Sequence, residues 1–253
     1  MDQQYEHVVQ FSAGIGSFGA AVRVQRCYGS SRMTLLIADT QVEDPDLWRF
    51  AQATSRMLDV PLVRVADGRT PFQVFHDNKF LGNSRIAPCT RVLKIEPCLR
   101  WLEKYADPKL TTLHIGIDAS RRDRNRIPPI ATNWQPWRTS FPLCEDDEPA
   151  LTKEELRAEA ASLGVEPPRL YELGYSHNNC GGVCVRAGKA QWLLTLATFP
   201  ERYAAAEEQE EEFRRANGNY SILRERRNKV TYQLTLRTLR LREEARQAAG
   251  PTR

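Results

Sequence analysis

The first 117 residues alternate short apolar runs with helical stretches, and this alternation constrains the fold more than any other feature of the chain. Four runs have the length and composition of buried strands: 7–11, 33–38, 61–66 and 110–117. Three stretches between them carry apolar residues at helical spacing: 18–28, 46–58 and 91–105. Strands that alternate with helices predict an α/β fold, with a parallel sheet flanked by helices.

The character of the chain changes after residue 127. Prolines, tryptophans and acidic residues run to about 150, a helix is predicted over 152–163, and a cysteine-bearing glycine segment and a helical remainder follow. We therefore predict a nucleotide-binding α/β core in 1–127 and, in 128–253, a C-terminal extension that holds the cysteine segment and helices. The apolar runs are too short to cross a bilayer, and no secretory signal is visible at the N-terminus. We expect a cytoplasmic protein with no membrane partner.

A small-residue turn lies between the first strand and the first helix, and it is the best candidate for a ligand site. Small side chains let backbone N–H groups approach an anion, and the helix N-terminus adds positive potential, so the turn suits a phosphate. It lacks the Gly-Lys-Ser/Thr ending of a P-loop. The candidate cofactor-binding residues of the turn are Ser12, Ala13, Gly14, Ile15, Gly16 and Ser17.

A dinucleotide fingerprint competes with this interpretation. Gly14, Gly16 and Gly19 satisfy G-x-G-x-x-G, and Asp39 ends the second strand about twenty residues later. The local pattern leaves three alternatives open: a site for nucleotide pyrophosphate activation, a nicotinamide or flavin fold, and a purely structural turn. Asp39 and Thr40, at the carboxyl end of the second strand, are candidates for contact with ribose, magnesium or adenine in the first two cases.

Motifs spread over residues 7 to about 190 resemble the pyrophosphatase-loop superfamily of adenine-nucleotide α-hydrolases, which includes phosphoadenosine phosphosulfate (PAPS) reductase. Ser12–Ser17 resembles its S-G-G-x-D-S signature, with Ala13 in place of the first glycine and Gly16 in place of the aspartate. Three later stretches resemble family segments and follow in the same order: Cys89 to Pro97, Gly116 to Arg122, and Leu170 to Cys180. The chain is most similar to the ATP-pyrophosphatase component of DNA phosphorothioation systems of the Dnd and Ssp type.

This resemblance implies an ATP pyrophosphatase and sulfurtransferase that uses ATP and Mg²⁺ to adenylate its substrate before sulfur is inserted. The substrate it implies is the DNA backbone. The partners it implies are a cysteine desulfurase and, on the DNA, a nickase. Arg122, in the loop after the fourth strand, takes a catalytic role by the same resemblance. Arg85, Arg91 and Lys94 are cations that we expect near a triphosphate or DNA phosphate.

Six cysteines in a chain of this class point to metal, redox or catalytic use before disulfides. Cys180 and Cys184 form a C-x-x-x-C pair, and Cys89 follows Pro88 at a predicted junction of loop and helix. We expect these three to converge as catalytic residues. They would act either as ligands of an iron–sulfur cluster such as [4Fe-4S], with one iron left open, or as persulfide carriers. Two further cysteines, Cys27 and Cys98, lie in helical patterns and are expected in the core.

Two other classes of function stay open. One is a different sulfur enzyme, either a sulfonucleotide reductase of the PAPS type or a tRNA thiolase; the reductases usually carry a nucleophilic cysteine near the C-terminus, and this chain has none after Cys184. The other is a non-catalytic nucleotide-binding partner of a cysteine desulfurase, an alternative that Gly16 favours because the family's aspartate is missing there. Release of pyrophosphate from ATP separates an enzyme from a scaffold.

Overall fold

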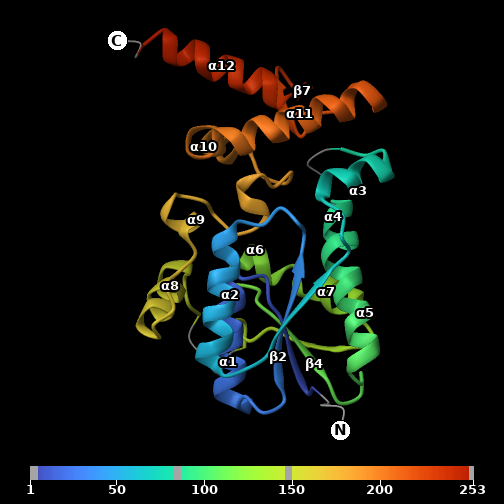
Figure 1. The fold of residues 1–253 in the computed structure, drawn as a ribbon, viewed down its shortest axis with the longest axis vertical. Coiled ribbons are helices and arrows are strands. Elements are labelled where there is room, and N and C mark those ends of the chain that lie inside the picture. Colours follow the sequence, from blue (N-terminus) through green and yellow to red (C-terminus); the bar gives the residue numbers. More distant parts are fainter. Residues whose placement is uncertain (1–4, 82–86, 146–149, 251–253) are drawn as a thin grey trace.

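The structure is a computed structural model that describes residues 5–81, 87–145 and 150–250. Within these residues, five strands form one parallel sheet in the order β3-β2-β1-β4-β5. The strands are β1 (His7–Gln10), β2 (Met33–Asp39), β3 (Leu62–Ala66), β4 (Thr112–Ile115) and β5 (Arg138–Ser140). The first four confirm the predicted strands, and the parallel sheet with its flanking helices confirms the predicted α/β class (Figure 1).

The central strand explains the apolar runs of the sequence. In β1, Val8 pairs with Thr34 of β2 on one side and with Leu113 of β4 on the other. Val8 and Val9 point to opposite faces of the sheet, and both are fully buried. A strand that is covered on both faces buries consecutive residues, so apolar residues such as Val8 and Val9 follow each other without alternation.

Helices cover both faces of the sheet (Figure 1). One face packs against α1 (Ile15–Tyr28), α2 (Pro45–Leu58) and α8 (Lys153–Ser162), in a core that includes Phe18, Phe50 and Leu156. The other face packs against α5 (Glu96–Tyr105) and α7 (Ile127–Asn133), around Leu102 and Leu113. The prediction of helices over 18–28, 46–58 and 152–163 is confirmed to within a few residues at their ends.

Shorter elements connect these layers. The predicted helix over 91–105 consists of a π-helical turn followed by an α-helix, and a short α-helical turn at 88–90 precedes them. The connecting elements are α3 (Pro71–Asn78), α4 (Pro88–Thr90), η1 (Arg91–Ile95), α6 (Arg121–Arg124), α9 (Arg169–Glu172) and the 3₁₀ turn η2 (Cys180–Gly182).

The last elements form a layer of their own beyond the carboxyl ends of the strands (Figure 1). This C-terminal layer, residues 189–248, contains α10 (Lys189–Thr198), α11 (Pro200–Asn217), β6 (Leu223–Arg227), β7 (Val230–Leu234) and α12 (Leu236–Ala248). Its core of Trp192, Tyr203 and Phe213 also packs against Phe72 and Phe75 of α3.

Two features of the second half of the chain lie outside the predictions. The antiparallel hairpin β6–β7 replaces part of the expected helical remainder; its turn residues Asn228 and Lys229 have positive φ, but neither is the glycine that usually signals such a turn. Strand β5 joins the main sheet although it follows residue 127, so the core sheet draws on both sides of that boundary. The division of the chain at residue 127 itself stays a prediction. Among the described helices, none has both the length and the apolar character that crossing a membrane requires.

Candidate nucleotide and thiol site

The glycine turn lies at the point where the sheet reverses its strand order. Chain connections lead from β1 to one side of the sheet through β2, while β4 flanks β1 on the other side, and ligands bind at such a switch point in open α/β sheets. The glycine turn after β1 and the loop after β4 lie close together there. A Cβ atom added to Gly116 would lie 2.6 Å from the carbonyl oxygen of Gly16 and 2.8 Å from the Cα of Ser17. A glycine after β4 is therefore required for this packing.

Hydrogen bonds within the turn fix its shape. The Ser17 hydroxyl accepts from the Ser12 N–H at 3.2 Å and donates to the Gly14 carbonyl at 2.8 Å. Ala13 has a left-handed φ of 52°, a conformation that costs a non-glycine residue about 1 kcal/mol or more. The surrounding structure stabilises this conformation, because the carbonyl of Ala13 accepts a hydrogen bond from the buried Asn178 side chain at 2.9 Å.

The N-terminus of α1 opens on this turn. Helix geometry leaves the N–H groups of Ile15, Gly16 and Ser17 without intrahelical acceptors. The Ile15 N–H donates to the Tyr171 hydroxyl at 3.0 Å, so Gly16 and Ser17 carry the donors that the helix itself leaves over. No acidic side chain lies in the first turn of α1. A phosphate is the ligand that such an end accepts most readily.

Asp39 and Thr40 lie at the same edge of the sheet, but both are engaged with protein groups. Asp39 is 3% exposed; it accepts from the backbone N–H of Gln41 at 2.8 Å and pairs with the Arg64 guanidinium, which stacks over Trp48. The Thr40 hydroxyl donates to Glu43 at 2.8 Å. The structure therefore gives Asp39 a partner within the sheet, and the nucleotide contacts of Asp39 and Thr40 stay predictions.

The three cysteines singled out in the sequence line one cavity. Its volume is about 280 Å³, and it lies between the loop after β2 and helix α11. Cys89 enters it from α4, and Cys180 and Cys184 enter it from the segment around η2. The residues that line the cavity with them are mainly apolar, among them Val42, Phe72, Val183, Val185 and Ala206. The expected convergence is thus observed, although 91 positions separate Cys89 from Cys180; the catalytic roles of the three cysteines stay predictions.

The three thiols differ in their pKa values. The interaction between the neighbouring thiols of Cys180 and Cys184 lowers the pKa of Cys184 and raises the pKa of Cys180 well above its usual value. Burial raises the pKa of Cys89. Near neutral pH the arrangement favours a thiolate at Cys184 beside a protonated Cys180, which is the polarity of a nucleophile with a neighbouring proton donor.

Lys94, expected near a phosphate, lies with the cysteines instead. Burial acts to lower the pKa of Lys94, but its electrostatic interactions with Cys180, Glu43, Cys184 and Cys89 outweigh burial and raise it, so the ammonium stays charged. Its Nζ is 3.8 Å from Glu43 Oε1, and its side chain is 28% exposed. Arg91, the second expected phosphate contact, is exposed and pairs with Glu96.

Glu43 and Asp44 attach the cysteine segment to the sheet, a role that the sequence did not suggest. Glu43 accepts from the Cys180 N–H. The fully buried Asp44 accepts from Arg169 at 2.8 Å and from Arg202 of α11 at 2.7 Å. Burial acts to raise the pKa of Asp44, but Arg169, the Asp46 N–H and Arg202 outweigh burial and hold it below its usual value. Asp44 is also the N-cap of α2, where its side chain accepts from the Asp46 N–H.

Three consecutive residues before Cys180 bury polar atoms that have no partner in the described structure. They are His177 Nδ1, Asn178 Oδ1 and Asn179 Oδ1. Burial lowers the pKa of His177, so its ring is neutral. Unpaired buried acceptors are costly, and here they lie between the glycine turn and the cysteine cavity. They are consistent with a polar ligand or water at this position.

The structure describes some of the other predicted residues and not others. The side chain of Arg122 and the residues 82–86 lie outside the described part of the chain. The aromatic side chains of Trp134, Trp137 and Tyr171 are buried. Cys98 is buried in the core as predicted, but the same prediction for Cys27 is wrong, because Cys27 is exposed near the end of α1.

An iron–sulfur cluster receives no support from the residues present. In the described part of the chain, no group of three or more His, Cys, Asp or Glu side chains is arranged to hold a metal ion. The Lys94 ammonium interacts electrostatically with all three cysteines, and Arg202 lines the same cavity. Mg²⁺ binds through one or two carboxylates together with substrate phosphates, so its site would be completed only by a nucleotide.

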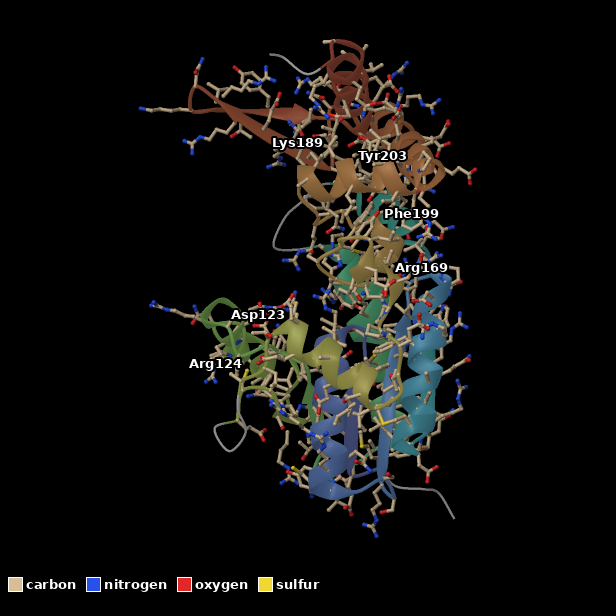
Figure 2. The ribbon with its side chains drawn as sticks, turned by 90° about the vertical axis from the view of Figure 1, so that its left-hand side faces the viewer. Asp123, Arg124, Arg169, Lys189, Phe199 and Tyr203 are labelled. Carbon is tan, nitrogen blue, oxygen red and sulfur yellow. The ribbon has the colours of Figure 1, made fainter. Side chains whose placement is uncertain are left out.

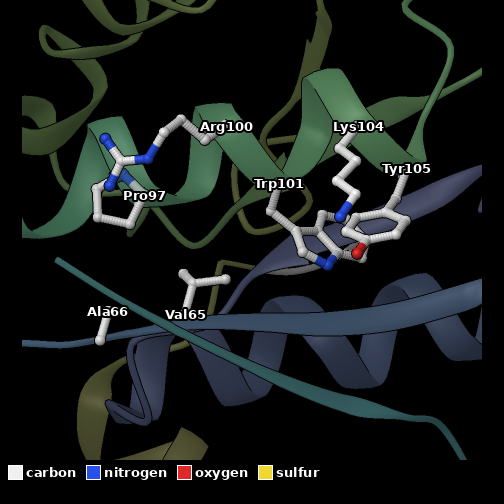
Figure 3. A pocket seen from close by; sticks show the side chains of 7 residues that line it. All are labelled: Val65, Ala66, Pro97, Arg100, Trp101, Lys104 and Tyr105. Carbon is white, nitrogen blue, oxygen red and sulfur yellow. The ribbon is translucent and has the colours of Figure 1, made fainter.

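A second pocket, also of about 280 Å³, lies outside this site (Figure 3). It opens between the end of β3 and one face of α5, where Arg100, Trp101, Lys104 and Tyr105 line it. None of the predicted site residues lines this second pocket.

Comparison with known proteins gives no assignment by sequence. No protein-family model and no curated protein matches the chain. Among solved structures, the chain is similar to phosphoadenylyl-sulfate (PAPS) reductase from Candida auris in its phosphate complex, with 12% identity, a TM-score of 0.44 and coverage of 70% of this chain and 80% of that one. It is also similar to NH3-dependent NAD synthetase from Campylobacter jejuni in complex with nitrate, with 13% identity, a TM-score of 0.40 and coverage of 85% of each chain. Likenesses at this level establish neither a shared activity nor shared ligands.

Proposed function

We propose that this chain is an ATP pyrophosphatase that adenylates a substrate oxygen ahead of sulfur insertion, with the DNA backbone as the acceptor. The observation that supports the proposal most is the continuity of the two halves of the site. One segment braces the glycine turn through Tyr171 and Asn178, and two residues later it begins the cysteine pair at Cys180. A group activated at the turn would lie next to a supply of nucleophilic sulfur.

The turn provides the ATP side of the reaction. Backbone N–H groups of Gly16 and Ser17, at the positive end of α1, would bind phosphate oxygens. Mg²⁺ would arrive with the triphosphate and screen its charge. Attack of the substrate oxygen on the α-phosphate releases pyrophosphate and turns that oxygen into an AMP leaving group. The turn holds its backbone N–H groups in place before the reaction, so they stabilise the charge of the departing pyrophosphate without reorganising.

The cavity provides the sulfur side. The Cys184 thiolate attacks the outer sulfur of a persulfide on a cysteine desulfurase; one S–S bond breaks, another forms, and the desulfurase leaves as a thiolate. The resulting outer sulfur on Cys184 displaces AMP from the activated centre. Cys180, whose thiol interacts with that of Cys184, then attacks the Cys184 sulfur and frees the thiolated product. This step leaves a Cys180–Cys184 disulfide, which a cellular thiol must reduce before the next cycle.

A non-catalytic nucleotide-binding partner of a desulfurase is the second candidate. The family's aspartate is replaced at Gly16, and the nearby Asp39 and Glu43 carboxylates are engaged by Arg64 and Lys94. Such a protein would bind ATP and would not cleave it.

Two variants separate these candidates in an assay for AMP and pyrophosphate with ATP, DNA and a desulfurase present. Gly116→Ala pushes a methyl group into the backbone of the turn and should abolish pyrophosphate release. Gly188→Ala is the matched control, because its Cβ meets open space. Cys184→Ser should keep pyrophosphate release but lose the mass gain of one sulfur atom on the protein. If the wild-type chain binds ATP and never releases pyrophosphate, the scaffold candidate replaces the enzyme.

A further inference from the structure

The hairpin β6–β7 extends from the C-terminal layer as a narrow two-stranded ribbon (Figure 2). Its base is anchored by Leu223 and Leu234, which pair with each other and are buried in the core of the layer. Its tip is a two-residue turn in which Asn228 and Lys229 have φ of 48° and 66°, the left-handed pair of a type I′ turn. Nine of the ten residues 224–233 are exposed, so the ribbon is held rigidly at its base and is free along its length.

The two faces of this ribbon differ in chemistry. Side chains alternate along a strand, and Arg224 pairs with Gln233 while Arg226 pairs with Thr231. One face therefore consists of Arg224, Arg226, Thr231 and Gln233, and we name it the arginine face. The opposite face carries four other residues: Glu225, Arg227, Val230 and Tyr232.

Only the arginine face keeps its positive charge. On the opposite face, Glu225 pairs with Arg227 at 3.0 Å and with Arg242 of α12 at 2.9 Å, so its charges are neutralised within the protein. Arg224 and Arg226 have no acidic partner among the residues that the structure describes. The same alternation places no carboxylate on the arginine face, which offers two guanidinium groups together with a hydroxyl and a side-chain amide.

We propose that the arginine face of the hairpin binds double-stranded DNA. A guanidinium binds a phosphate through paired hydrogen bonds, and a two-stranded ribbon fits the width of the major groove. The ribbon has free arginines on one face and neutralised charge on the other. A polyanion therefore binds to the arginine face and not to the opposite one. An acidic protein would be the other ligand for such charge, and the test below includes it.

This inference rests on the proposed function only in taking DNA as the ligand. In Figure 2, the hairpin and the α6 region, where Asp123 and Arg124 are labelled, project toward the same side of the molecule. Helix α6 follows β4 at the carboxyl edge of the sheet, where the glycine turn lies. A duplex held on the hairpin would therefore lie on the side of the molecule from which α6 leads to the site.

The test is fluorescence anisotropy with a labelled duplex of about 20 base pairs, at salt from about 50 to 200 mM. The variant Arg224→Gln/Arg226→Gln removes the arginine face. The control Arg215→Gln/Arg227→Gln removes the same net charge from arginines that pair with Glu208 and Glu225. We expect the first variant to weaken binding about tenfold or more at low salt and to reduce the salt slope by about 2, while the control binds like the wild type.

Three outcomes would overturn the inference. They are no binding by the wild type at low salt, equal losses in the two double variants, and binding of polyglutamate in preference to DNA, which would assign the face to an acidic protein. Calorimetric binding of ATP, measured without DNA on the same variants, keeps this test apart from the proposed function. A chain that binds DNA through the arginine face and never cleaves ATP would contradict only the proposed function.

Discussion

The carboxyl edge of the sheet and the C-terminal layer use the same charged residue types in opposite ways. At the edge, Asp44 is fully buried, and its partners Arg169 and Arg202 lie 125 and 158 positions away in the sequence. In the C-terminal layer, pairs such as Arg246 with Glu243 join neighbours on one helix and lie at the surface. Buried, long-range pairs fix the position of distant segments, whereas exposed local pairs leave a surface charged and free to meet a partner.

From this comparison we expect the largest loss of stability when Asp44 is replaced. The change Asp44→Ala removes an N-cap and leaves two guanidinium groups without their buried partner, so the free energy of unfolding should fall by about 3 kcal/mol. The local pair of Glu243 with Arg246 in the C-terminal layer is the matched case, and Glu243→Ala should cost much less. Urea unfolding measures both changes. Equal costs for the two variants would remove the distinction between the two regions.

Glu210 lies in the C-terminal layer but is buried, unlike the exposed charged pairs of that layer. It is fully buried and accepts from the N–H groups of Ile222 and Leu236, and burial raises its pKa to about 7 despite these bonds. Since its folded pKa lies above the unfolded value of 4.5, Glu210 contributes stability that is present below about pH 4.5 and is lost as the pH rises toward about 7.

The change Glu210→Gln should remove this dependence. Between about pH 4.5 and 7, the unfolding free energy of the wild type should fall relative to the variant, by at most about 1.4 kcal/mol per pH unit, the limit for one proton. Chemical unfolding of both proteins across this range provides the measurement. A constant difference between them at every pH would show that Glu210 does not titrate in the window.

The smallest effect is expected at Lys94, where one charge acts on neighbouring thiols. Lys94→Met removes a cation that helps to lower the pKa of Cys184, so alkylation of Cys184 by iodoacetamide near pH 7 should slow about tenfold or less. Arg91→Met is the control, because Arg91 is exposed in the same turn and pairs with Glu96. Mass spectrometry of the modified peptides reports the rate. An unchanged rate in Lys94→Met would exclude Lys94 from the control of thiol charge.

Sequence patterns predicted the features that depend on local spacing. The strands at 7–11 and 33–38 carry consecutive apolar residues because both faces of the sheet are covered, and the turn at Ser12–Ser17 is recognisable because small residues follow a strand. The convergence of Cys89 with Cys180 followed from one further rule, that functional loops of a parallel sheet gather at one edge.

Features that depend on contacts across the chain were not predictable in this way. Nothing local links Asp44 to Arg202, and Lys94 carries the same charge whether it faces a phosphate or a thiolate. Asn178 offered a weak signal, as a polar residue in the Ser-His-Asn-Asn-Cys run, but its bond to Ala13 spans 165 positions. The hairpin β6–β7 was missed because its turn, Asn228-Lys229, lacks glycine.

The central claim is that the glycine turn binds an adenine nucleotide through its phosphates, and calorimetric titration tests it most directly. Wild-type protein with Mg²⁺ should bind ATP or AMP and should bind NAD more weakly. Gly116→Ala should lose this binding, because the added Cβ would lie 2.6 Å from the Gly16 carbonyl, while Gly188→Ala keeps it. Tight binding of NAD with no binding of ATP or AMP would contradict the account and favour the dinucleotide interpretation of Gly14, Gly16 and Gly19.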